Sequence, residues 1–575
     1  MMIPKQYQAI EDFERYLGDP ANPDNPFSTR RVMQLDEQEE YPQELLDTIN
    51  GWGAACYHVP QSYGGKLVSL EQSLSLARSV ARRDITVGVA NGVCLLGALP
   101  VWFSGSEEQK QRVAELLLTH CKLGFALSER ERGHDILSND TSATLDESDY
   151  ILNGEKWTIG HATRSDALTL YARTAPNGGA RGYTMFLLDK RLLHPDDYAY
   201  VPKLKTLGLR AHDLSGIRLD QLRLPASAKI GAEGDGLLLA TQATLVTRTL
   251  CAAIMLGGTD TALRMTVDFA LNRQLYGKPL YEMEHIRATL ADVLVDLLIS
   301  DCLATSTARA WHMITDQMSI WASAVKYFVP TVLEESVHQL ASVLGSRFFL
   351  RDDYAEGLFQ KIYRDIPIVS VFEGSSNAQL HGVALQLRQL LRQRPSSQES
   401  LADRLRRTFC YQESIDEFVQ PDKIELHSHG QNDALEGIEH SLTLLMDRSH
   451  PLQERVAVLV QSLLAQLAQL RSDYASCSSQ LRDKSLMQLE FSQHYIRLHT
   501  AAVCFHTWVY NLDQLDDFFH AGEWLEAALS KLLHPEQRMS SRMTPKILDT
   551  LGQQLVNRLK NNTAYSIVPI QYGSS

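Results

Sequence analysis

The hydrophobic period changes twice along the chain, and these changes limit the fold more than any single motif does. Over residues 41–120 the apolar residues recur at helical spacing. Over residues 121–233 short β-like runs take over, separated by turn residues such as Asn153-Gly154 and Asn177-Gly178-Gly179. Helical spacing returns over residues 236–391. The order predicts an α+β protein with a helical domain, a central antiparallel sheet or small barrel, and a helical bundle.

A further helical unit follows the bundle. The segment at 394–400 is polar and can bury little surface, which is typical of a linker. Residues 401–575 again show helical spacing. The predicted units are a helical domain at 1–120, a β-domain at 121–233, a helical bundle at 234–393, the linker at 394–400 and a C-terminal helical extension at 401–575.

Charge and cysteine content exclude several classes of protein. The net charge is −14 over 575 residues, whereas nucleic-acid binding needs a clustered basic surface. The eight cysteines contain no C-x-x-C pair and indicate buried thiols in a reducing compartment. His427-Ser428-His429 has no further ligands at metal spacing, so we predict no metal site. No h-region and no run of about 18 apolar residues is seen, so we expect a cytoplasmic protein without a membrane span.

Glu373 lies between an apolar stretch and a turn of small residues. Val371 and Phe372 would keep water away from its carboxylate, which suits a general base that takes a weakly acidic proton. Gly374 allows a ligand or a second backbone to approach closely. Alternatively, Glu373 occupies the first turn of a helix that begins near Gly374, where the helix dipole favours negative charge. These residues alone leave both roles open and favour the second.

Several motifs, in one order over residues 40–390, resemble the acyl-CoA dehydrogenase family. They are Val59-Pro60-Gln61-Ser62-Tyr63-Gly64-Gly65, Phe103-Ser104-Gly105-Ser106-Glu107-Glu108-Gln109-Lys110, Phe125-Ala126-Leu127-Ser128-Glu129 with Gly133-His134-Asp135, Leu152-Asn153-Gly154-Glu155-Lys156-Trp157, and Asn272-Arg273-Gln274-Leu275-Tyr276-Gly277-Lys278-Pro279-Leu280. Each motif is weak alone, but their shared order is strong evidence. The resemblance implies the fold of that family and a flavin oxidoreductase acting on CH–CH groups, with FAD as its cofactor.

The resemblance places the family's catalytic base on Glu373. In the family this carboxylate removes the α-proton of an acyl thioester, while the β-hydrogen leaves as a hydride to flavin N5. Preorganised donors must hold the thioester oxygen as the enolate develops. The resemblance implies that the backbone N–H of Glu373 is one donor and that His134, Arg248 and Gly374 lie near the substrate. A salt bridge on the helix surface is the alternative role of Arg248.

The resemblance also implies a set of residues that contact FAD. They are Phe125, Leu127, Ser128, Gly133, Trp157, Thr158, Arg273, Tyr276, Gly345, Ser375 and Asn377. Arg273 matches an arginine that reaches the FAD pyrophosphate of a neighbouring subunit, where a cation faces phosphate. That contact would require an oligomer.

Some cofactor positions depart from the family pattern. Thr158 stands where a flavin-packing Trp is usual, and Gly160 stands where the family has Thr or Ser. His134 replaces the Ser of a Gly-Ser-Asp loop, Glu284 replaces a Gln, and Ser342 replaces another Gln beside a changed glycine loop. The lost hydrogen-bond donors and the carboxylate of Glu284 predict either weaker FAD binding or different contacts between the protein and the flavin.

The extension at 401–575 resembles, in position and length, that of the very-long-chain branch, and this implies a homodimer. Three functions are open. The first is dehydrogenation of an acyl-CoA in fatty acid metabolism, with an electron-transferring flavoprotein as the acceptor. The second is the same desaturation of an acyl group on an acyl carrier protein in a biosynthetic pathway. The third is a non-dehydrogenase or cofactor-poor binding protein of the same fold. Retention of Glu373 favours dehydrogenation.

Overall fold

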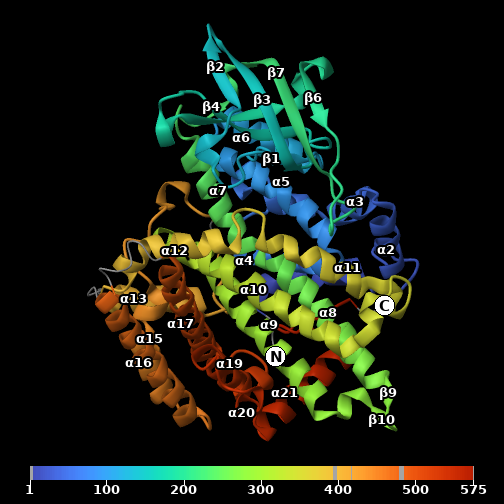
Figure 1. Cartoon of the computed structure of the whole chain (residues 1–575), viewed down its shortest axis with the longest axis vertical. Coiled ribbons are helices and arrows are strands. Elements are labelled where there is room, and N and C mark those ends of the chain that lie inside the picture. The colour runs from blue at the N-terminus through green and yellow to red at the C-terminus, as the bar shows by residue number, and fades with distance from the viewer. Residues whose placement is uncertain (1–3, 393–397, 416–417, 478–484, 574–575) are drawn as a thin grey trace.

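The N-terminal region is helical, as predicted. The computed structural model describes residues 4–392, 398–415, 418–477 and 485–573, and Figure 1 shows a sheet at one end of a helical body. The N-terminal α-helices are α1 (Gln8–Leu17), α2 (Thr29–Gln38), α3 (Gln43–Trp52), α4 (Leu70–Arg83), α5 (Ile85–Ser104) and α6 (Glu107–Leu118). Asp84 separates α4 from α5, because its side chain accepts a 3.0 Å hydrogen bond from the Thr86 backbone N–H.

Eight strands form the sheet of the β-domain. They are β1 (Leu123–Ala126), β2 (Ser142–Asp146), β3 (Asp149–Gly160), β4 (Ala167–Arg173), β5 (Tyr183–Asp189), β6 (Tyr198–Val201), β7 (Leu214–Pro225) and β8 (Lys229–Ile230). Their order is β6-β7-β3-β2-β4-β5-β8, with β1 beside β4. Most pairs are antiparallel, as predicted. Strand β1 is parallel to β4, and β2 meets β4 in parallel at Ser142 and Arg173. The alternation of apolar residues does not reveal these two pairings.

The two predicted turns of the β-domain have different outcomes. Asn177-Gly178-Gly179 does separate β4 from β5. The prediction of a turn at Asn153-Gly154 is wrong, because both residues lie inside β3. The register of β3 with β7 shifts between Leu152 and Gly154. Gly154 has φ of 140°, and a Cβ there would lie 2.7 Å from the Cα of Thr141. Glycine therefore allows a bulge here rather than a hairpin.

The helical bundle follows the sheet. Its elements are α7 (Gly236–Leu250), α8 (Ala252–Asn272), β9 (Gln274–Leu275), β10 (Lys278–Pro279), α9 (Glu284–Ala310), α10 (Met318–Leu344), α11 (Leu358–Asp365) and α12 (Ser376–Leu390). Leu290, Val293 and Leu297 of α9 are fully buried, as are Trp321 and Val325 of α10. Helical spacing therefore predicts the core face of both helices correctly.

The C-terminal extension is also helical. It contains α13 (Gln398–Phe409), α14 (Asp433–Glu436), α15 (Ile438–Met446), α16 (Gln453–Cys477), α17 (Ser485–Asn511), α18 (Asp517–Ala521), α19 (Glu523–Leu533), α20 (Met539–Arg542) and α21 (Pro545–Lys560). Residues 398–400 of the expected linker already belong to α13, and residues 394–397 lie outside the described residues.

The extension shares its core with the bundle instead of forming a separate one. Their buried apolar residues make one contiguous cluster, and a second cluster fills the sheet. Arg309 of α9 joins three parts of the chain. One terminal nitrogen pairs with Glu71 of α4 at 2.6 Å, and the other donates to the backbone oxygens of Cys410 and Glu413. Such a buried cation is stable only because each of its donors is satisfied.

The segment Thr563–Tyr572 (the C-terminal strap below) runs back against the N-terminal helices. Its Ser566 hydroxyl donates to Asp301 of α9 at 2.6 Å. Arg78 of α4 donates to the Tyr565 carbonyl at 3.1 Å and to the Ser566 hydroxyl at 3.0 Å. The guanidinium of Arg82 lies 3.1 Å from the centre of the Tyr572 ring. The strap therefore covers one side of α4.

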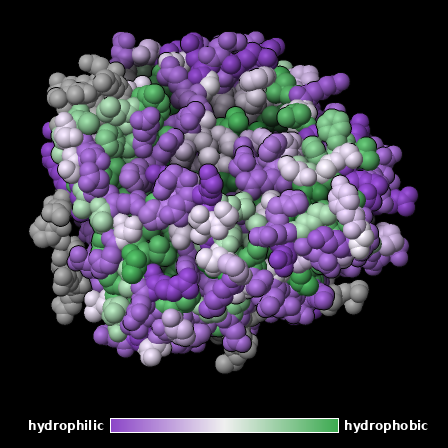
Figure 2. All heavy atoms as spheres, turned by 60° about the horizontal axis from the view of Figure 1, so that its bottom comes forward, coloured by the Kyte–Doolittle hydropathy of each residue, from purple (hydrophilic) through white to green (hydrophobic). Residues whose placement is uncertain are grey.

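Among the described residues, two helical stretches are long and apolar enough, by length and composition alone, to cross a membrane. They are α5 and the stretch Gly236–Asn272, and most of each is buried inside the structure. Core helices of this length meet the same criterion. Figure 2 shows the end of the molecule farthest from the sheet, where hydrophilic residues predominate and the hydrophobic ones form small separate groups. This face carries no broad apolar patch among the described residues.

Candidate active site

Glu373 lies in a strained turn just before α12. Its φ is 55° and that of Gly374 is 91°, so both residues are left-handed. Helix α12 begins only at Ser376, and Ser375 caps it by accepting a 3.3 Å hydrogen bond from the Ala378 N–H. Glu373 is therefore not in the first turn of the helix, and the structural alternative for this residue is wrong. A non-glycine residue held left-handed commonly marks a functional site.

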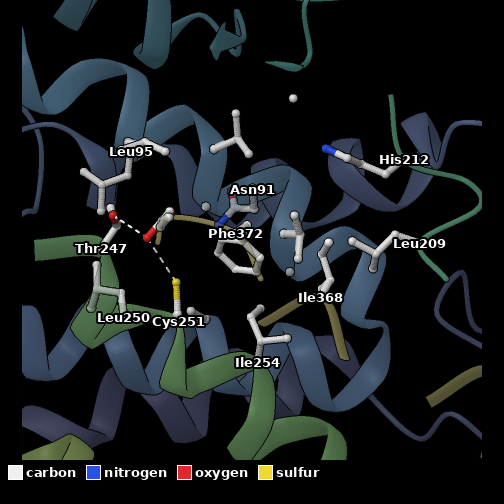
Figure 3. Close-up of a pocket in the computed structure, with 18 of the residues that line it drawn as sticks. Asn91, Leu95, Leu209, His212, Thr247, Leu250, Cys251, Ile254, Ile368 and Phe372 are labelled. Carbon is white, nitrogen blue, oxygen red and sulfur yellow. Dashed lines mark hydrogen bonds between the residues drawn. The ribbon is translucent and has the colours of Figure 1, made fainter. Parts of the chain in front are cut away.

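One face of α7 holds the carboxylate of Glu373. The Thr247 hydroxyl donates to its Oε2 at 2.7 Å, and the Cys251 thiol lies 3.3 Å from the same oxygen (Figure 3, dashed lines). Burial, reinforced by the nearby carboxylate, raises the pKa of Cys251 well above its usual range, so this group remains a thiol that donates. Sequence reasoning missed both residues. Their i, i+4 spacing places them on one helical face, but only the fold shows what they face.

Arg248 supports the turn through the backbone. Its Nε donates to the Glu373 carbonyl oxygen at 3.1 Å. Burial lowers the pKa of its guanidinium, and the charge of Glu373 opposes that effect. Arg248 thus lies beside Glu373 rather than in a salt bridge on the helix surface. A Cβ at Gly374 would lie 3.5 Å from Arg248 and 2.5 Å from Gln379, so glycine is needed for this close approach.

Lys326 of α10 is a second buried cation near the turn that the sequence did not reveal. It is 1% exposed, and its ammonium donates to the Val369 carbonyl and lies 4.2 Å from the centre of the Phe372 ring. Burial lowers its pKa. Lys326 therefore anchors the apolar run that leads to Glu373.

Glu373 borders a largely apolar cavity of about 550 Å³. Leu76, Ala77 and Val80 of α4 form part of the wall, and Phe13 of α1 and Tyr57 lie farther toward the N-terminal helices. Figure 3 shows Ile254, Ile368 and Phe372 around the same space, with Asn91 and His212 among them. A cavity of this size can enclose a small ligand and exclude water from the carboxylate.

The ends of β1 and β3 form the wall nearest the sheet. Phe125, Leu127, Ser128 and Thr158 all line the cavity. The buried Lys156 fixes this wall, because its ammonium donates to Leu127 O at 3.1 Å and pairs with Glu129.

Thr158 occupies a second strained position at the cavity. Its φ is 58° at a register shift of β3, although β-branched residues rarely adopt this conformation. A flat ring fits this wall, because apolar faces flank it and Ser128, Thr158 and His212 supply polar atoms. Among the described residues Nδ1 of the buried His212 has no hydrogen-bond partner, and Gly160 allows Val93 and His212 to lie close to the β3 backbone. The residues present therefore fit the flavin of FAD.

The other predicted cofactor and substrate residues do not line the cavity. Trp157 turns away from it and stacks under Arg130 at 4.6 Å. His134, which follows Gly133 in an exposed loop, accepts a 3.3 Å hydrogen bond from the Ser375 N–H, so this loop does meet the turn after the base. Asn377 is exposed on α12.

Three more predicted residues also do not line this cavity. Arg273 and Tyr276 belong to the β9–β10 hairpin at the opposite end of the molecule from the sheet, and Gly345 follows α10 (Figure 1). All three are exposed, and Tyr276 is 94% exposed. None of the three lines the cavity that Glu373 borders.

Comparisons with known proteins agree with the geometry. The N-terminal, middle and C-terminal domain models of the acyl-CoA dehydrogenases match residues 27–120, 124–222 and 234–387. The probable acyl-CoA dehydrogenase FadE25 of Mycobacterium leprae is 28% identical over 351 residues, which is 60% of this chain and 88% of that protein.

Two solved structures share the fold at lower identity. The acyl-CoA dehydrogenase complexed with FAD from Bacillus anthracis has a TM-score of 0.68 and 17% identity, covering 98% of this chain and 95% of its own. The prolyl acyl carrier protein oxidase AnaB has a TM-score of 0.61 and 20% identity, covering 67% of this chain and all of its own. The first likeness includes the C-terminal extension. The chain therefore belongs to the acyl-CoA dehydrogenase family, whose members are FAD-dependent oxidoreductases that act on CH–CH groups.

Proposed function

We propose that this protein introduces an α,β double bond into an acyl thioester, with Glu373 as the base that removes the α-proton. The observation that carries the proposal is the position of the Glu373 carboxylate. It borders an apolar cavity and is held there by Thr247 and Cys251. A positioned carboxylate in a water-poor site can take a weakly acidic proton.

Each part of the cavity has a role in this reaction. The apolar wall of α4 and α5 holds the acyl chain and excludes water. The backbone N–H of Glu373 holds the thioester oxygen as negative charge develops on it. Arg248 keeps that backbone in place through the Glu373 carbonyl. FAD, when bound against Ser128 and Thr158, supplies the acceptor for the hydride from the β-carbon.

We also propose that the active protein is a homodimer. Arg273, Tyr276 and Gly345 are exposed and do not line the cavity of their own chain, which suits contacts with FAD in a second subunit. The C-terminal extension packs on α9 and α12 through α17, so this side of the bundle is already covered. We further propose a cytoplasmic location, a role in fatty acid metabolism and an electron-transferring flavoprotein as the acceptor.

A second substrate class is an acyl group on an acyl carrier protein. The likeness to a prolyl acyl carrier protein oxidase supports it. The chemistry at Glu373 would be unchanged, because both substrates are thioesters. Only the contacts outside the cavity would differ between the two carriers.

The visible absorption spectrum of the purified protein tests these proposals. Saturated acyl-CoA esters of several lengths are added without oxygen, and in parallel the same acyl groups are added on a carrier protein. Bleaching of the oxidised flavin by an ester supports acyl-CoA dehydrogenation, and bleaching by the carrier alone supports the second class. A protein that binds no FAD would overturn both and favour a binding protein of the same fold.

A further inference from the structure

His212 is a buried side chain with a ring nitrogen that no described residue pairs. It lies in the segment between β6 and β7, is 4% exposed and lines the cavity (Figure 3). Its Nδ1 has no hydrogen-bond partner among the described residues. Buried polar atoms are normally paired, and an unpaired one calls for a ligand or another explanation.

The ring of His212 lies next to Gly160, at the end of β3. A Cβ added to Gly160 would lie 3.2 Å from Nε2 of His212 and 3.1 Å from Cγ2 of Val93. The absence of a side chain at Gly160 therefore allows the imidazole to lie close to the backbone of β3. Thr158, two residues earlier, faces the same cavity. The imidazole thus stands at the wall that fits the flavin.

The surroundings of His212 keep its ring neutral. Burial lowers its pKa to about 4, against a smaller opposite effect of Asp213. The ring of His161 is its nearest aromatic neighbour, at 5.2 Å between centroids, and His161 is itself engaged with the Tyr41 hydroxyl at 3.0 Å. A neutral imidazole carries one donor and one acceptor nitrogen.

We propose that the imidazole of His212 forms a hydrogen bond with the isoalloxazine ring of FAD, at the cavity wall that it shares with Ser128 and Thr158. The connection between β6 and β7 thus supplies a polar ring to this wall, next to the end of β3. The proposal rests on FAD binding, which is part of the proposed function, and not on the identity of the acyl substrate.

Replacement of His212 tests the proposal directly. His212→Phe keeps a flat ring and removes both nitrogens, whereas His212→Gln retains a donor and an acceptor. The apoprotein of each variant is titrated with FAD, and the flavin spectrum, the flavin reduction potential and the melting temperature of the apoprotein are recorded. We expect about tenfold weaker FAD binding for His212→Phe, a shifted flavin spectrum, and recovery of most of the affinity in His212→Gln.

Two substitutions that should compensate each other, Gly160→Ser and His212→Ala, give a sharper test. Gly160→Ser alone places new atoms against the imidazole and should weaken FAD binding, and His212→Ala alone should also weaken it. The double variant restores a hydroxyl in the freed space, so its affinity should exceed that of either single variant. Losses that simply add would overturn the proposal, as would His212→Phe with the affinity and spectrum of the wild type. A wild-type chain that binds no FAD would overturn the proposed function as well.

Discussion

The Thr247 hydroxyl donates a 2.7 Å hydrogen bond to the Glu373 carboxylate, although 126 residues separate them in the chain. Cys251, one turn further along, lies 3.3 Å from the same oxygen. Helix α7 therefore sets the direction of the carboxylate, while the left-handed turn sets only the place of its backbone. Catalysis then depends on the packing of α7 as much as on the base itself.

We expect Glu373→Gln to bind acyl thioesters but to reduce the flavin about 10²- to 10⁴-fold more slowly, the usual contribution of a general base. Glutamine has the same shape and can still accept from Thr247. Anaerobic stopped-flow absorbance measures the rate, and the rise in amplitude with ester concentration gives the affinity. Reduction at the wild-type rate would exclude Glu373 as the base.

Thr247→Val should slow flavin reduction about tenfold with little change in KM, because the carboxylate loses the hydrogen bond that orients it. Thr241→Val is the matched control, since Thr241 lies on the same helix and donates only to the Leu237 carbonyl. Equal rates for the two variants would show that Thr247 does not position the base.

Phe13→Ala should shift the preference toward longer acyl chains, because Phe13 lines the cavity on the side of the N-terminal helices. Phe27→Ala serves as the control. Phe27 is equally buried but does not line the cavity, and both changes should cost about 3–5 kcal/mol of stability. The ratio of kcat/KM across a series of esters is the measurement. An unchanged ratio in Phe13→Ala would contradict this role.

Tyr572→Ala should lower the free energy of unfolding by about 3–5 kcal/mol, because the ring packs against Arg82 and its hydroxyl donates to Asp260. Tyr16→Ala should cost much less, since Tyr16 is 47% exposed. Denaturant unfolding of both variants checks this expectation. Similar losses would mean that the C-terminal strap contributes little to stability.

Acid should destabilise the fold through its buried histidines. Burial lowers the pKa of His58, His212 and His506 to about 4, below the ordinary 6.5. The unfolded chain therefore binds more protons between pH 6.5 and 4, so stability falls as the pH falls through this window. Each residue should cost about 2 kcal/mol at pH 5 relative to pH 8.

The melting temperature between pH 8 and 5 measures that loss. Replacing His506, which bonds Ser441 and the Ala434 carbonyl, by Gln should flatten the curve. A slope unchanged in His506→Gln would show that this residue does not take up the proton.

The sequence predicts the parts of this protein that repeat a local pattern. The stripe containing Leu290, Val293 and Leu297 is buried, and Glu373 stands out because an apolar run meets a glycine turn. Thr247 could not be identified as a partner, because its contact joins distant segments and leaves no periodic trace. For a related reason, the sequence does not show that Trp157 lies outside the cavity lining. A register shift beside it puts Thr158 on the cavity side, and bulges cannot be read from residue alternation.

The contact between Ser566 and Arg78 joins residues 488 positions apart, and it gives the protein an order of assembly. A ribosome completes the sheet and the bundle long before the strap emerges. Until then Arg78 and Arg82 have their carboxylate partners Asp301 and Glu14 but lack their contacts with the strap. The strap therefore adds its contacts to α4 only after the sheet and the bundle that carry the cavity have been synthesised.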